Sequence, residues 1–124
     1  SPLGRGILTG KIGDTSALSK NDYRHTVPRF QKENFESNKR LLSRIKQLAD
    51  TKKITPAQLS LAWLLNKGEN IIPIPGTKHE KYLIENTKAV DVELPQDEMQ
   101  HLDDTYISVA GERYNDMGMK FTNL

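Results

Sequence analysis

The spacing of apolar residues predicts two consecutive helices in the stretch 36–68. From about residue 36 to residue 52, apolar side chains recur at intervals of three or four, and charged residues occupy the remaining face. This is the pattern of an amphipathic helix with one buried face. The apolar positions of that face are Leu41, Leu42, Ile45, Leu48 and Ala49. The second helix, from about residue 56, is apolar around most of its circumference, which predicts burial on more than one side.

The second helix has a complete start signal. Thr55 and Gln58 have the spacing of a capping box, in which each side chain accepts a hydrogen bond from the other residue's backbone amide. Pro56 stands at the first helical position, and Ile54 and Leu59 have the spacing of a hydrophobic staple. These signals predict a helix that begins at residue 56.

The wholly apolar stretch 71–74 predicts a short strand of the buried, parallel type. No second strand is expected within this chain to pair with it. Unpaired ladder groups cost about 1 to 3 kcal/mol each when buried, so we expect the isolated segment not to hold its native form.

A second capping-box pattern, Thr77 with Glu80, follows this stretch and predicts a helix over residues 77–89 that begins at about Lys78. The first amides of such a helix point outward, and Lys78 would add a positive charge beside them. This helix start would suit a phosphate group. Taken alone, the pattern is also explained by an ordinary capped helix with a surface lysine, which is the commoner case.

The remaining segments carry weaker patterns. Residues 11–35 have no sustained period and are predicted to form a long loop, which is a candidate flap over a ligand. A disordered insert is the alternative. A short helix is expected over residues 96–105, and an irregular tail over residues 106–124.

Composition excludes several classes of function. Eighteen basic and sixteen acidic residues give a net charge of +2 with no basic stripe, so we expect no nucleic-acid partner. The chain has no cysteine and no apolar run of membrane-spanning length, so neither a disulfide framework nor a membrane anchor is expected. A cytoplasmic location fits this composition. The three histidines, far apart in sequence and without ligand spacing, predict no metal site; they are His25, His79 and His101.

Two glycine motifs for nucleotides are incomplete at the start of the chain. A Walker loop would need glycine and a hydroxyl residue where the chain has Arg5 and Ile12. A Rossmann fingerprint would need glycine in place of Thr9. Any nucleotide site here must therefore be of another kind.

Four motifs, in order and spacing, resemble the aldo-keto reductases. They are Ser-Pro-Leu-Gly-Arg-Gly at residues 1–6, Pro-Arg-Phe at 28–30, the helix sequence at 55–65, and Ile-Pro-Gly-Thr-Lys with Tyr-Leu-x-Glu-Asn at 74–86. The resemblance implies an α/β fold, namely the C-terminal part of a single (β/α)₈ TIM barrel domain, helix-rich with one complete short strand. A whole barrel needs roughly 250 residues, so the 124-residue chain is expected to be a segment of a longer protein.

The resemblance also implies a function, that of an NADP-dependent oxidoreductase reducing aldehydes or ketones to alcohols. It places the pyrophosphate loop at residues 1–10, the 2'-phosphate contacts at the helix start and the adenine contacts two turns later. The implied cofactor-binding residues are Ser1, Pro2, Leu3, Gly4, Arg5, Gly6, Gly76, Thr77, Lys78, Tyr82, Glu85 and Asn86. Many members have arginine where this chain has Tyr82, so Lys78 would supply most of the phosphate charge and Tyr82 would stack on the base.

The catalytic Asp, Tyr, Lys and His of such enzymes precede the seventh strand, so no catalytic residue is assigned within this chain. We expect the chain alone to lack reductase activity, with the preceding part of the barrel and a small carbonyl compound as its partners. A dinucleotide-binding regulatory or sensing subunit of the same fold is the main alternative, and a helical interaction module is a weaker one.

Overall fold

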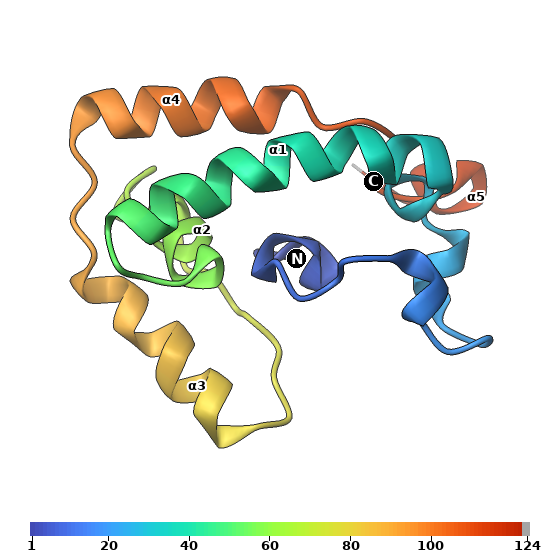
Figure 1. The fold of residues 1–124 in the computed structure, drawn as a ribbon, viewed down its shortest axis with the longest axis horizontal. Helices are drawn as coiled ribbons and strands as arrows, with labels where there is room; N and C mark the ends of the chain where they lie inside the picture. The colour runs from blue at the N-terminus through green and yellow to red at the C-terminus, as the bar shows by residue number, and fades with distance from the viewer. Residues whose placement is uncertain (123–124) are drawn as a thin grey trace.

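The computed structural model describes residues 1–122, apart from the side chain of Ile107. Figure 1 shows a helical structure in which two long helices, α1 and α4, lie one above the other. The α-helices are α1 (Lys32–Thr51), α2 (Pro56–Leu65), α3 (Glu80–Thr87), α4 (Gln96–Ile107) and α5 (Asp116–Met119). Short 3₁₀ helices complete the structure: η1 (Gly4–Thr9), η2 (Thr15–Ala17), η3 (Tyr23–Thr26), η4 (Pro28–Phe30) and η5 (Lys88–Asp91).

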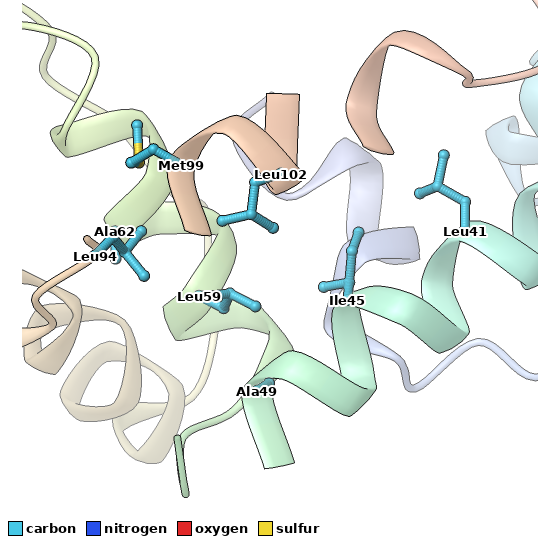
Figure 2. Packing of buried hydrophobic residues seen from close by; sticks show 8 residues of the cluster. All are labelled: Leu41, Ile45, Ala49, Leu59, Ala62, Leu94, Met99 and Leu102. Atoms are coloured by element: carbon cyan, nitrogen blue, oxygen red, sulfur yellow. The ribbon is translucent and has the colours of Figure 1, made fainter. Parts of the chain in front are cut away.

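The main core lies where α1, α2 and α4 meet, and Figure 2 shows its side chains pointing toward one another. Helix α1 contributes the predicted apolar face, with Leu41, Ile45 and Ala49 buried. The remaining members are Leu59, Ala62, Leu94, Met99 and Leu102. The predicted amphipathic face of α1 is therefore confirmed, and burial of this apolar surface is what holds the three helices together.

The capping box at the start of α2 is confirmed. Thr55 Oγ1 accepts a hydrogen bond from the Gln58 amide at 3.2 Å, and Gln58 Oε1 accepts one from the Thr55 amide at 3.0 Å. Pro56 occupies the first turn as predicted. Ile54 packs against the cluster that contains Leu59, as the staple pattern predicted.

The strand predicted over residues 71–74 is wrong: none of residues 1–122 forms a strand, and 71–77 run as irregular backbone. Ile72 and Ile74 are 82% and 83% exposed. The physical reason is that a parallel strand needs a neighbouring strand to accept and donate its ladder hydrogen bonds. The apolar sequence specifies a buried strand, but no described residue supplies its partner.

The helix after this segment begins later than predicted. Its first residue is Glu80 rather than Lys78, and its N-cap is His79. Thr77 does not form the expected box with Glu80, because its hydroxyl accepts a hydrogen bond from the His79 amide at 3.1 Å. A hydroxyl that binds the amide two residues on makes a local turn, which competes with helix capping.

The long loop predicted over residues 11–35 is more ordered than its sequence pattern indicated. Two aspartates act as caps for short 3₁₀ turns: Asp14 accepts from the Ser16 amide and Asp22 from the Arg24 amide. A second apolar cluster anchors the segment, and helix α1 already begins at Lys32. The buried members of this second cluster are Ile7, Val27, Phe30 and Phe35. The last described part of the chain is also partly helical, since α4 extends to residue 107 and α5 follows it.

Candidate cofactor-binding site

The opening loop has an unusual backbone. Gly4, Arg5 and Gly6 have φ angles of 55°, 59° and 95°, so three successive residues lie in the left-handed region. Glycine adopts this region without a steric penalty, but arginine does not. Internal hydrogen bonds hold the loop in place: the Arg5 amide donates to Ser1 Oγ at 2.9 Å and the Gly6 amide to the Leu3 carbonyl at 2.9 Å.

Leu3 and Thr9, on either side of these three residues, line a cavity of about 100 Å³ together with α3 and the turn before it, although the two segments lie far apart in sequence. In Figure 1 the opening segment and α3 lie on either side of the chain that links α2 to α3. Six of the predicted cofactor residues line the cavity: Leu3, Gly76, Thr77, Tyr82, Glu85 and Asn86. The tertiary structure therefore brings together half of the set that the sequence indicated.

Helix α3 is held in position by the cap of α2. Thr55 Oγ1 donates to Glu85 Oε1 at 3.0 Å, and Gln58 Nε2 donates to the Glu85 carbonyl at 2.9 Å. Asn86 is buried beside this contact. The same two residues that start α2 thus hold Glu85, one of the two residues predicted to meet the adenine.

Lys11 was not predicted as a site residue, yet it lines the cavity together with Thr9 and Ala57. Its ammonium lies 3.6 Å from the centroid of the Tyr82 ring. The nearby Lys11 ammonium lowers the pKa of the Tyr82 phenol, and Lys81 lowers it further. The sequence signal that could have indicated Lys11 is its position directly after Gly10. In the structure Gly10 has a φ of 70° and turns the chain at the end of the loop.

The other predicted residues lie outside this cavity. Lys78 is exposed and lines an adjoining open hollow of about 470 Å³ with His79; Gly76, Thr77 and Tyr82 border both spaces. The Arg5 guanidinium lies over Tyr114, 4.6 Å from the ring centroid, and 5.8 Å from that of Tyr23. Ser1, Pro2, Gly4 and Gly6 shape the loop but are not among the lining residues.

Two other kinds of site find no support in the described part of the chain. Residues 1–122 contain no group of three or more His, Cys, Asp or Glu side chains arranged to hold a metal ion. None of the helices described here has the length and apolar character needed to span a membrane.

Comparison with known proteins agrees with the sequence motifs. A model of the Aldo/keto reductase family matches residues 1–107. This chain belongs to the aldo/keto reductase family. Membership implies a TIM barrel for the whole fold, and the predicted family is confirmed. In a TIM barrel the helices form an outer ring around eight parallel strands.

Three relatives of this aldo/keto reductase chain are similar over most of its length. The NADP(+) aldo-keto reductase yakc of Schizosaccharomyces pombe is 45% identical over 116 residues, which cover 92% of this chain and 34% of the relative. A probable aldo-keto reductase of Glycine max is 42% identical over 116 residues, which cover 92% of this chain and 33% of the relative. The aldo-keto reductase str7 of Strobilurus tenacellus is 40% identical over 99 residues, which cover 80% of this chain and 30% of the relative. The chain thus spans about a third of the length of these relatives.

Proposed function

We propose that this chain forms the C-terminal third of the barrel of an NADP-dependent reductase, which reduces aldehydes or ketones to alcohols. Its own part is to hold the adenosine end of the cofactor. The observation that carries this proposal is the cavity that the opening segment lines together with α3 and the turn before it. Family membership supports the reaction class.

The residues around the cavity suit a phosphorylated adenosine. Lys11 and Lys78 place two ammonium groups at the cavity and the adjoining hollow, where a 2'-phosphate would be neutralised by charge-assisted contacts. The Tyr82 ring borders both spaces and supplies aromatic surface for the adenine, with the Lys11 ammonium lying against the ring. Glu85 and Asn86 offer a hydrogen-bond acceptor and an amide for the edge of the base.

Each of these residues would bind or orient the cofactor, and none of them takes part in the chemical step. NADPH, when bound, would supply the hydride that reduces the carbonyl carbon. The proton donor would come from residues outside this chain. Preference for the phosphorylated dinucleotide is supported by the relative from Schizosaccharomyces pombe, which is named with NADP(+).

The test is NADPH consumption by the full-length protein with a reactive aldehyde such as 4-nitrobenzaldehyde. We expect steady-state turnover by the full-length protein and none by the 124-residue chain alone, both purified free of host reductases. Tight NADPH binding by the full-length protein without turnover of any aldehyde would favour the dinucleotide-binding regulatory subunit instead.

A further inference from the structure

Arg24 of η3 contacts the backbone of the opening loop, although the two lie 19 residues apart in sequence. Its Nη1 donates to the Arg5 carbonyl at 3.4 Å. The same nitrogen lies against the next residue of the loop, because a Cβ on Gly6 would be 3.6 Å from it. The guanidinium therefore packs on the peptide bond between Arg5 and Gly6.

Asp22 fixes the direction of this guanidinium. The Nε of Arg24 donates to Asp22 Oδ1 at 2.9 Å, and its Nη2 donates to Oδ2 at 2.7 Å. Such a two-point pair gives geometric specificity as well as energy. The two side chains are 27% and 18% exposed, and the hydrogen bonds from Arg24 hold the pKa of the Asp22 carboxyl well below its usual range. Of the three guanidinium nitrogens, Nη1 is the one that this pair leaves for the loop.

The Arg5–Gly6 peptide bond is held at both ends. Its N–H, on Gly6, donates to the Leu3 carbonyl at 2.9 Å, and its carbonyl, on Arg5, accepts from Arg24. These two groups of a trans peptide point in opposite directions, so a rotation of the peptide plane would break both hydrogen bonds. The φ of 59° at Arg5 is costly for a residue with a side chain, and such a conformation persists only where its surroundings hold it.

We propose that Arg24, oriented by Asp22, is a positioning residue that keeps the opening loop in the shape that binds the pyrophosphate of the dinucleotide. This inference rests on the proposed function, because it adds a residue to the same cofactor site. Arg24 acts through the loop backbone: its charge is paired with Asp22, and it is not among the residues that line the cofactor cavity.

The test measures the dissociation constants of the full-length protein for NADPH and NADH at fixed low salt. Arg24→Gln is expected to weaken both dinucleotides by about fivefold, the effect of losing one hydrogen bond, because the pyrophosphate is common to both. In turnover of 4-nitrobenzaldehyde, the KM for NADPH should rise and kcat should stay unchanged, because the loop contacts a part of the cofactor that does not react.

Asp22→Asn separates positioning from charge. Loss of the carboxylate leaves Arg24 without its orientation, so this variant should also weaken both dinucleotides. An effect of charge alone has the opposite sign, because removal of a negative charge favours an anionic ligand. The double variant should bind no more weakly than Arg24→Gln, since both changes act through one contact. Arg24→Lys keeps the charge but lacks the planar fork, so it should restore only part of the affinity.

Asp103→Asn is the matched control. It removes the same charge from an ion pair of similar exposure, that of Asp103 with Lys67, which lines no part of the cavity. It also loses a hydrogen bond, the one that Trp63 Nε1 donates at 2.7 Å. Affinity for both dinucleotides should be unchanged. An equal loss of affinity in this control would show that the variants report general destabilisation, and would overturn the inference.

The remaining outcomes also decide. The inference is overturned if Asp22→Asn leaves binding unchanged or strengthens it, if Arg24→Lys restores the full affinity, or if the two losses add in the double variant. A loss confined to NADPH would place Arg24 at the 2'-phosphate and overturn it too. If the wild-type protein binds both dinucleotides and every variant matches it, the inference fails while the proposed function stands. If the wild-type protein binds neither dinucleotide, both fail.

Discussion

The ammonium of Lys11 lies 3.6 Å from the centroid of the Tyr82 ring. This contact joins the residue that ends the opening loop to the first turns of α3, and both residues line the candidate cofactor cavity. A cation placed over an aromatic face is attracted by the ring's negative charge density. The pair therefore holds the two walls of the cavity together.

The first prediction concerns the titration of Tyr82. Lys11→Gln should raise the pKa of the Tyr82 phenol toward its ordinary value, because Lys11 is the largest cause of its lowering. A lowered pKa favours the phenolate in the folded protein, so the associated stability appears only as pH rises through the folded-state pKa. The measurement is phenolate absorbance of the full-length protein, with Tyr82→Phe subtracted. Lys81→Gln should raise the pKa less; a larger rise there would contradict the Lys11 contact.

The second prediction concerns cofactor preference. Lys78→Ala in the full-length protein should weaken NADPH binding by about tenfold, the effect of one exposed charge-assisted contact, and leave NADH nearly unchanged. Lys88→Ala is the matched control, since Lys88 is exposed at the far end of the same helix and lines neither the cavity nor the adjoining hollow. Dissociation constants from protein fluorescence at fixed low salt provide the comparison. Equal losses for both dinucleotides would remove Lys78 from the phosphate site.

The third prediction concerns the cap shared by α2 and α3. Thr55→Ala removes the acceptor for the Gln58 amide and the donor to Glu85. It should lower the free energy of unfolding by about 1 to 2 kcal/mol and loosen the position of α3, which would weaken NADPH binding. Thr55→Ser keeps the hydroxyl and should lose little stability and little affinity for NADPH. Urea unfolding and NADPH titration measure the two effects; equal stability of the Ala and Ser variants would show that the cap does not matter.

The fourth prediction concerns the attachment of the tail. Asn38 is buried and makes three hydrogen bonds, two to Ala110 and one to the Arg29 carbonyl. Asn38→Ala leaves these backbone groups without partners and should lower the free energy of unfolding by about 2 to 3 kcal/mol. Proteolysis after residue 109 should become faster. Asn34→Ala, which loses a single bond to the Pro28 carbonyl, should have a clearly smaller effect on both readouts.

The fifth prediction concerns alkaline pH. Burial raises the pKa of Tyr106 to about 12, so the folded protein favours the neutral phenol. The stabilisation that comes from this raised pKa is complete at pH values below the unfolded-state pKa of about 10. It is lost as the pH rises toward the folded-state pKa. Tyr106→Phe should therefore be less stable than wild type at about pH 8, and this difference should shrink at about pH 11.5. Urea midpoints at both values test this; a constant difference would show that Tyr106 does not titrate as described.

The sequence alone determined the elements whose signals are local. The apolar face of α1 and the capping box of α2 depend on residues within one or two turns of each other, so their pattern is sufficient to specify them. The family and the six predicted residues that line the cavity were also accessible, because their motifs lie in order along the chain.

Only the tertiary structure decided the features that depend on remote partners. Residues 71–74 carry a strand sequence, but a strand forms only beside another strand, and the described residues provide none. The start of α3 shifted because Thr77 had two amides within reach, those of His79 and Glu80, and the sequence does not say which one its hydroxyl binds. Lys11 reaches Tyr82, and Arg5 turns to Tyr114, through contacts between segments far apart in the chain. The direction of a long side chain is set by whichever distant group packs beside it, and packing of that kind exists only once the chain has folded.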